Sequence, residues 1–283
     1  MRMKTGIFGL DELLGSGFIR KSVNIILGST GTGKTIFALQ FLLKGLKTGE
    51  KGIFISFDMD ENKIIDIAES IGWEEIKDFT KDGLLTVRKF YAEDISYITH
   101  DLLTFINSEA RGETRLAIDS FTPLIVSLGY EVRNDINWFF SKLRDVCTTV
   151  ITLEEPLNGD LSLPFVSIPL FLGDTVIHLR NIGYGEAFNR TIRIIKHRGS
   201  WHAEGVFPYR ILDGFGIFIE GYEYVLQQYE RVDLEEILEN AGVEKEKLDN
   251  ATFKRLKRLA ESRMSDKKTV LLEILKHLKK DSV

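Results

Sequence analysis

Gly28-Ser29-Thr30-Gly31-Thr32-Gly33-Lys34-Thr35 is the stretch that decides the fold of this 283-residue chain. It fits the pattern G-x-x-x-x-G-K-[ST] in full. It stands between a β-rich run, Val23–Leu27, and Thr35–Leu46, whose apolar residues have helical spacing. In such a unit the glycines let successive backbone N–H groups point at phosphate oxygens, and the helix adds the positive end of its dipole. The sequence therefore predicts a nucleotide-binding loop.

Two side chains of this loop have expected roles. Lys34 should reach the β- and γ-phosphates, and the hydroxyl of Thr35 should be a ligand of Mg²⁺. Such a site needs a further carboxylate at the end of a neighbouring strand, and Asp119 follows the apolar run Arg115–Ile118. Thr35 and Asp119 are therefore the predicted metal ligands.

A third requirement is a group that orients or deprotonates the attacking water. The strand predicted over Gly52–Phe57 is followed by three acids, Asp58, Asp60 and Glu61. Asp60 also suits the N-cap of a helix over Glu61–Ile71. This leaves Asp58 as the nearer carboxylate and the predicted catalytic one.

Two cations stand near the end of the strand predicted over Thr191–Arg198. Alternation along that strand places His197 on one side and predicts that four residues share the other: Ile192, Ile194, Lys196 and Arg198. A pair of cations at a strand end is either a solvated edge or a group that reaches a phosphate. Spacing alone leaves both interpretations open.

Strand and helix signals alternate over the first 155 residues and predict a mostly parallel sheet with helices on both faces. The segment Pro156–Gly173 is punctuated by glycine and proline and is expected to be a loop. Four further strands are predicted beyond it, at Thr175–Arg180, Thr191–Arg198, Phe207–Leu212 and Gly216–Ile219. Their connections are too short for crossover helices, so we expect antiparallel additions to one sheet edge.

From about Val232 onward the pattern is helical. Asp233 can cap a helix over Leu234–Asn240, and Ser265 can cap a last helix. That last helix has one apolar stripe, made of Val270, Leu271, Ile274, Leu275 and Leu278. The stripe either packs on its own protein or binds a partner.

Composition excludes several classes of protein. With 43% hydrophobic and 28% charged residues the chain is not mainly disordered. No apolar run is long enough to cross a bilayer, and the N-terminal sequence is not that of a signal peptide. Cys147 is the single cysteine, so an intrachain disulfide is excluded. These features predict a cytoplasmic protein.

The net charge of −5 combines an acidic body with a basic C-terminal tail, which makes the body a poor surface for nucleic acid.

Several motifs in collinear order resemble the KaiC-like branch of the RecA superfamily. They are TGIFGLDELLGSGF (5–18), GSTGTGKT (28–35), GIFISF (52–57), LAIDS (116–120) and IIKHRGSWHAEGVFPYRI (194–211). The most specific piece is Lys196–His202, close to the signature K-x-R-G-[ST]-x-H of that branch. The resemblance covers about residues 4–220 and does not extend to residues 225–283.

The resemblance implies a RecA-type three-layer αβα P-loop ATPase domain over residues 1–222, followed by a helical extension over 223–283. It implies ATP and Mg²⁺ as ligands and assembly into a ring, commonly a hexamer. In that family the nucleotide lies between neighbouring subunits, and the K-x-R residues act in trans. Carried onto this sequence, those residues are Lys196 and Arg198.

Two departures from the family pattern matter. Two adjacent glutamates usually follow the second strand, one of them catalytic, whereas here Asp58-Met59 follow Phe57. A shorter carboxylate and a thioether predict slow turnover. In the clock-protein member a Ser-Thr acceptor pair precedes an Asp-Thr dipeptide. Alignment on Asp174-Thr175 places Leu170-Phe171 there, so autokinase activity of that kind is not expected.

The sequence thus favours an ATPase that hydrolyses or senses ATP at subunit interfaces and acts as a regulatory switch, with the helical tail as a site for a protein partner. One alternative is a RadA-like recombinase paralogue. Its DNA-binding loops would be Val126–Asp135 and Pro156–Gly173, which together contain one basic residue, Arg133. Another alternative is an interaction module that binds ATP without hydrolysing it.

Overall fold

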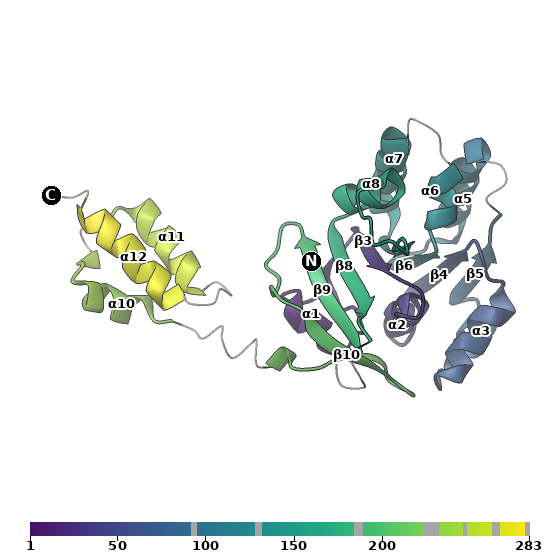
Figure 1. Ribbon diagram of the computed structural model, residues 1–283, viewed down its shortest axis with the longest axis horizontal. Helices are drawn as coiled ribbons and strands as arrows, with labels where there is room; N and C mark the ends of the chain where they lie inside the picture. The colour runs from purple at the N-terminus through teal and green to yellow at the C-terminus, as the bar shows by residue number, and fades with distance from the viewer. Residues whose placement is uncertain are drawn as a thin grey trace. The chain divides into compact units, whose positions relative to one another are not determined.

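Six parallel strands and three antiparallel ones form the main sheet (Figure 1). The computed structural model describes residues 1–91, 95–127, 132–183, 189–223, 232–245, 248–261 and 267–280. Within these residues the sheet has nine strands in the spatial order β11-β10-β9-β8-β3-β7-β6-β4-β5. In chain order they are β3 (Val23–Gly28), β4 (Lys51–Ser56), β5 (Leu85–Lys89), β6 (Thr114–Asp119), β7 (Thr148–Glu154), β8 (Thr175–Asn181), β9 (Arg190–His197), β10 (Phe207–Leu212) and β11 (Gly216–Ile219).

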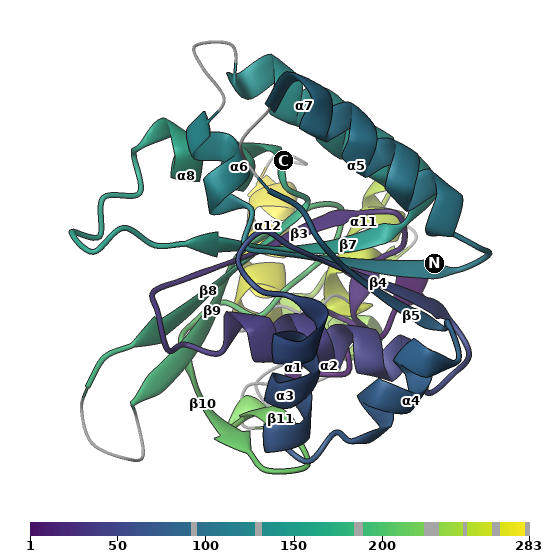
Figure 2. The same cartoon turned by 90° about the vertical axis from the view of Figure 1, so that its right-hand side faces the viewer.

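Helices cover both faces of this sheet (Figure 2). One face carries α2 (Lys34–Leu46), α3 (Glu61–Ser70) and α4 (Glu75–Lys81). The other carries α5 (Ile95–Glu109), α6 (Thr122–Ser127), α7 (Val132–Val146) and α8 (Pro164–Leu172). Strands β3 and β6 between them are buried along their whole length and mostly apolar, as expected when both faces of a parallel sheet are covered. The predicted three-layer α/β fold class is confirmed.

The core between the sheet and α5–α8 fixes the segment that follows β6. Phe121 is 1% exposed and stacks on Phe139 of α7, with ring centroids 5.8 Å apart and planes 9° apart. Its backbone N–H also donates to the carbonyl of Thr152 on β7. Aromatic burial on this scale stabilises a fold by about 2–3 kcal/mol per side chain. The carboxyl end of β6 is therefore rigidly placed.

One predicted loop is a helix, and this changes the direction of a strand. The segment Pro156–Gly173, expected to be a loop, contains α8, with Pro164 in its first turn and Pro169 inside it. The packing of Val166 and its apolar neighbours into the core outweighs the cost of the internal proline. Because α8 supplies a crossover from β7, β8 enters parallel to β3, and the prediction that Thr175–Arg180 is antiparallel was wrong. The next three strands are antiparallel, as predicted.

A β-bulge in β9 overturns the predicted face of Lys196. Ile194 pairs with Ile177, but Lys196 pairs with the preceding residue of β8, Val176, so Ile195 is the extra residue. Paired residues share a side, and successive residues of β8 face opposite sides. Lys196 therefore lies on the side opposite Ile194, and it is His197 that shares the face of Ile194.

A second unit follows the first: the described chain divides into Met1–Glu220 and Gly221–Val283. In the second unit Asp233 caps α10 (Leu234–Ala241) by accepting from the N–H of Glu235, as predicted. With α11 (Asn250–Glu261) and α12 (Lys267–Lys280) it forms a small core of its own. Leu271 and Leu275 of the predicted apolar stripe are fully buried in this core. Ser265, the predicted cap of the last helix, lies outside the described residues.

None of the helices described in either unit is long and apolar enough to cross a membrane.

The N-terminal hairpin of β1 (Arg2–Met3) and β2 (Phe18–Ile19) depends on Gly17, which has φ of 102°. A Cβ there would overlap the carbonyl oxygen of Met3. Gly49 has φ of 80° but no atom within 4 Å of an added Cβ, so it is a matched control. Gly49→Ala should lower the free energy of unfolding by about 1–2 kcal/mol, the cost of a left-handed backbone.

Gly17→Ala should cost at least about 2 kcal/mol more than the control, because overlap adds to the backbone cost. Chemical denaturation of both variants measures the difference. Equal losses in the two variants would show that the hairpin has no tight contact at Gly17.

Candidate nucleotide-binding site

The predicted loop Gly28–Thr35 joins β3 to α2 and borders a cavity of about 480 Å³ at the carboxyl edge of the sheet. Gly31 and Gly33 have φ of 80° and 86°, a conformation that side chains disfavour, and Gly33 opens α2. The Thr32 hydroxyl donates to the carbonyl of Ser29 at 2.7 Å, and the Tyr209 hydroxyl of β10 donates to the carbonyl of Thr32. The loop is thus held from within and by a side chain of β10.

Lys34 keeps its ammonium beside this loop. Its Nζ donates to the carbonyls of Gly28 at 2.9 Å and Ser29 at 3.0 Å. Burial lowers the pKa of Lys34, and the negative charges of Glu154 and Asp119 oppose that shift. A cation held beside a glycine-rich loop at the start of a helix suits a ligand that carries several negative charges.

Asp119 and Thr35 meet as predicted. The Thr35 hydroxyl donates to Oδ2 of Asp119 at 2.7 Å, and the Thr152 hydroxyl of β7 donates to Oδ1. Asp119 is 4% exposed, and this burial raises its pKa despite the two hydroxyl donors.

A hydroxyl and a carboxylate in contact fit Mg²⁺, which prefers oxygen ligands and is usually completed by phosphates and water. Among the described residues no group of three or more His, Cys, Asp or Glu side chains is arranged to hold a metal ion. A metal at Thr35 and Asp119 would therefore depend on the phosphates of a bound nucleotide.

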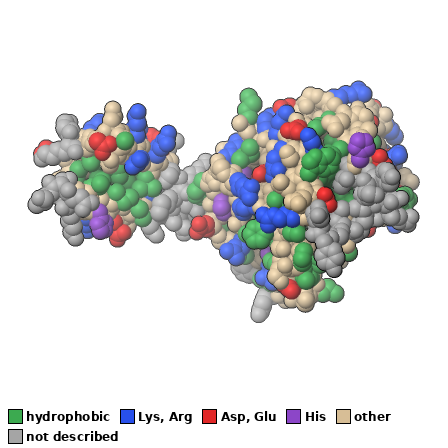
Figure 3. All heavy atoms as spheres, turned by 90° about the horizontal axis from the view of Figure 1, so that it is seen from above, with side chains coloured by type: hydrophobic (Ala, Val, Ile, Leu, Met, Phe, Trp, Pro, Cys, Tyr) green, Lys and Arg blue, Asp and Glu red, His purple; other side chains and the backbone are tan. Residues whose placement is uncertain are grey.

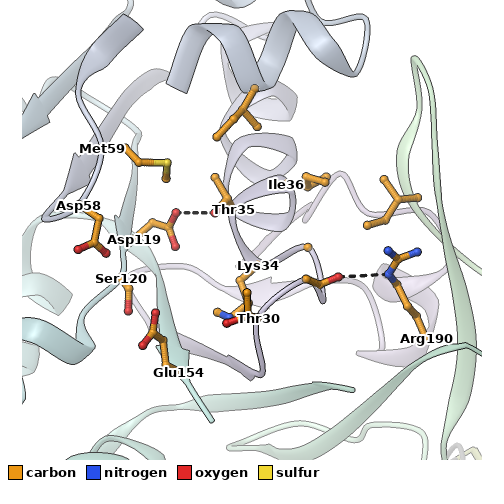
Figure 4. Close-up of a pocket in the computed structure, with 14 residues that line it drawn as sticks. Thr30, Lys34, Thr35, Ile36, Asp58, Met59, Asp119, Ser120, Glu154 and Arg190 are labelled. Carbon is orange, nitrogen blue, oxygen red and sulfur yellow. Dashed lines mark hydrogen bonds between the residues drawn. The ribbon is translucent and has the colours of Figure 1, made fainter. Parts of the chain in front are cut away.

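The acids after β4 divide between two roles. Asp58 and Met59 line the cavity, as Figure 4 shows. The Asp60 carboxylate accepts from the N–H of Lys63 at 3.0 Å and caps α3, as its spacing predicted. Of these acids, Asp58 is the one that lines the cavity.

The structure does not bring Lys196 and Arg198 to the cavity of their own chain. Lys196 Nζ donates to the carbonyls of Leu170 at 2.7 Å and Phe171 at 3.0 Å, and Arg198 Nη2 donates to Phe171 at 2.8 Å. These carbonyls belong to the last turn of α8, where cations are favoured by the helix dipole. The two cations do lie together, but at another place on the unit.

Sequence reasoning missed several residues that line the cavity. Glu154 ends β7, and Arg190 begins β9 and donates to the carbonyl of Gly31 at 3.4 Å. Ser120 and Ile211 complete the same walls. The one available signal was the sheet order: an acid at the end of a strand next to β3 must lie near the loop.

A comparison with protein families identifies the family of the chain. A family model described as "ATPase: KaiC" matches residues 3–223. The chain belongs to the KaiC ATPase family. Its matched region ends close to the boundary of the first structural unit. The loop, the Thr35–Asp119 pair and the residues that line the cavity all lie within the region that this model matches.

Curated members of the KaiC family are similar to this chain at about 30% identity. Circadian clock protein KaiC3 of Synechocystis sp. is 30% identical over 234 residues, which are 77% of this chain and 45% of that protein. The circadian clock oscillator protein KaiC of Parasynechococcus marenigrum is 30% identical over 242 residues, 82% of this chain and 47% of the relative. The chain spans about half the length of the curated relatives it matches.

Thr152→Val tests how the KaiC-family chain holds Asp119. Removing one donor from a buried carboxylate should lower the free energy of unfolding by about 1–3 kcal/mol. Thr149→Val is the matched control, because Thr149 lies on the same strand, is 0% exposed like Thr152, and its hydroxyl contacts the Cys147 sulfur and no carboxylate. Urea denaturation should show a clearly larger loss for Thr152→Val. Equal losses would contradict the importance of this hydrogen bond.

Lys196 should make the stability of the chain depend on pH. Burial, and then the charge of Arg198, lowers the pKa of Lys196 to about 8. Since lysine in the unfolded chain has a pKa of about 10.4, the unfolded state binds more protons between these two pH values, and stability rises with pH there. Lys196→Arg removes this titration, because arginine stays protonated.

Wild type should therefore gain stability relative to Lys196→Arg as the pH rises through this interval. Denaturation midpoints of the two proteins across the interval measure the difference. A constant difference would show that Lys196 is not buried against α8.

Proposed function

We propose that this chain is a Mg²⁺-dependent ATPase that hydrolyses ATP slowly at the interfaces of a ring, commonly a hexamer, and serves as a nucleotide-dependent switch. The observation that carries the proposal is the charge of the cavity. Among the described side chains that line it, three are acids (Asp58, Asp119 and Glu154) and two are cations (Lys34 and Arg190). These described side chains alone do not neutralise a triphosphate, which supports Mg²⁺ and cations of a neighbouring subunit as further partners of the nucleotide.

Each predicted residue then has a role toward ATP. The backbone of Gly28, Ser29, Thr30, Gly31, Thr32 and Gly33 holds the phosphates, and Lys34 neutralises charge on the β- and γ-phosphates. Thr35 and Asp119 hold Mg²⁺, which when bound neutralises phosphate charge and orients the γ-phosphate. Asp58 orients the attacking water.

Lys196 and Arg198 act on the nucleotide of the neighbouring subunit in this proposal. Their position supports it, because they form a pair of cations outside the cavity of their own chain. To reach a phosphate they must give up carbonyls in the last turn of α8, and a phosphate is the stronger partner for a guanidinium. Nucleotide binding in one subunit would in this way change α8 in the next.

We propose slow turnover because of two residues in the wall of the cavity. Asp58 has one methylene fewer than glutamate, and the Met59 thioether beside it cannot accept a proton. Slow hydrolysis suits a switch, whose state must last long enough for a partner to bind.

We propose residues 223–283 as the extension that binds a protein partner. Leu271 and Leu275 are already buried within this unit and are not available to a partner. The surface that we propose for the partner is the exposed face of α11, which carries Lys254, Arg255, Lys257 and Arg258. Figure 3 shows Lys and Arg side chains beside hydrophobic ones on the visible face of the helical unit. This composition suits a partner with an acidic surface.

The recombinase alternative has less support. Between Pro156 and Gly173, where a RecA-type protein would contact DNA, the chain has no lysine or arginine.

Mixing two inactive variants tests the trans arrangement. Lys34→Ala should lose nucleotide binding, and Arg198→Ala should lose the cation that acts on the neighbour. In a random one-to-one mixture about a quarter of the interfaces combine an intact loop with an intact Arg198, so about a quarter of wild-type ATPase activity should return. Phosphate release from the mixture and from each variant alone is the measurement. A mixture as inactive as its components would contradict interfacial hydrolysis.

A further inference from the structure

Glu154 occupies a fixed position beside the phosphate-binding loop. It is the last residue of β7, where it pairs in register with Gly28 of β3. Its N–H donates to the Thr122 hydroxyl at 2.9 Å, and the N–H of Glu155 donates to the carbonyl of Gly28 at 3.0 Å. The backbone on both sides of the Glu154 Cα atom is therefore anchored, and only its side chain can move.

The Glu154 carboxylate points into the cavity. Figure 4 shows it between Ser120 and the ammonium of Lys34, with Asp58 on the far side of Asp119 in the same view. Lys34 Nζ is held beside the loop by the carbonyls of Gly28 and Ser29. The Glu154 carboxylate therefore faces the lysine that would meet the γ-phosphate.

No structural role accounts for this carboxylate. Glu154 is exposed to the cavity, and none of the hydrogen bonds or ion pairs found among the described residues involves its side chain. Its neighbour Glu155 differs, because Oε2 of Glu155 lies 3.0 Å from Nε2 of His178 and both side chains are only 10% exposed. An acid in a site for a triphosphate also repels the ligand, so its presence calls for a function in the reaction.

We propose that Glu154 is a further catalytic residue that supplies the second carboxylate missing at Met59. It would accept the proton of the attacking water: the water O–H bond breaks, its oxygen bonds to the γ-phosphorus, and the bond to the β-phosphate oxygen breaks to release ADP. Asp58 and Glu154 would then orient one water from opposite sides of Asp119. This role rests on the proposed ATPase function.

The test compares three variants of the full chain in Mg²⁺ and ATP: Glu154→Gln, Asp58→Asn and Glu74→Gln. Glu74 is an exposed acid outside the cavity and is the matched control. Single-turnover phosphate release reports the chemical step, and binding of a fluorescent ATP analogue reports affinity. Glu154→Gln should slow the chemical step by about 100-fold or more, the usual contribution of a positioned acid–base group.

Nucleotide affinity should stay unchanged or rise in Glu154→Gln, because a repelling charge is removed, and Glu74→Gln should match wild type. If Glu154→Gln releases phosphate within twofold of wild type while Asp58→Asn is slow, the role of Glu154 is wrong and the ATPase proposal stands. If wild type itself releases no phosphate, the ATPase proposal fails and the role of Glu154 fails with it. Weaker analogue binding with an unchanged chemical step would assign Glu154 to binding and overturn its catalytic role.

Discussion

The opposed charges of Lys34 and Asp119, held at one edge of the sheet, are the constraint on which the rest of this structure depends. Burial removes water from both groups, which lowers the pKa of Lys34 and raises the pKa of Asp119. Both shifts favour the neutral form of the group. Hydroxyl donors on α2 and β7 and the carbonyls of the loop compensate for part of that loss. A phosphate with its cation would be a partner for both groups at once. Binding of a nucleotide would therefore offset the free-energy cost of burying these two charged groups.

The same edge links the site to the rest of the unit. The chain leaves the cavity after Glu154, the last residue of β7, and then forms α8. The last carbonyls of α8 accept hydrogen bonds from Lys196 and Arg198. One continuous segment therefore joins the nucleotide site of a chain to the cations proposed to act on its neighbour. A change at the cavity could reach those cations through this segment and the hydrogen bonds at the end of α8, which is the kind of link that the proposed switch needs.

Much of the site could be predicted from local patterns. The loop, Lys34, Thr35 and Asp119 follow from a motif whose chemistry dictates both residue types and spacing, and the cap at Asp60 follows from its short side chain. The errors arose where tertiary packing overrides local signals. Three prolines and two glycines between Pro156 and Gly173 predicted a loop where α8 forms, and the direction of β8 depended on that helix. The bulge at Ile195 has no signal in the sequence. Glu154 was missed because its place follows from sheet order, which alternation along one strand does not reveal.

The central claim is that the loop binds a triphosphate at a boundary between subunits. The most direct measurement is the molar mass in solution, by sedimentation, with Mg²⁺ and a triphosphate that cannot be hydrolysed, with Mg²⁺ and ADP, and without nucleotide. The account predicts that the triphosphate raises the mass from that of smaller species to a closed assembly of several 32.3 kDa chains, and that Arg198→Ala weakens this assembly. Tight binding of the triphosphate by a chain whose mass stays that of a monomer would contradict it.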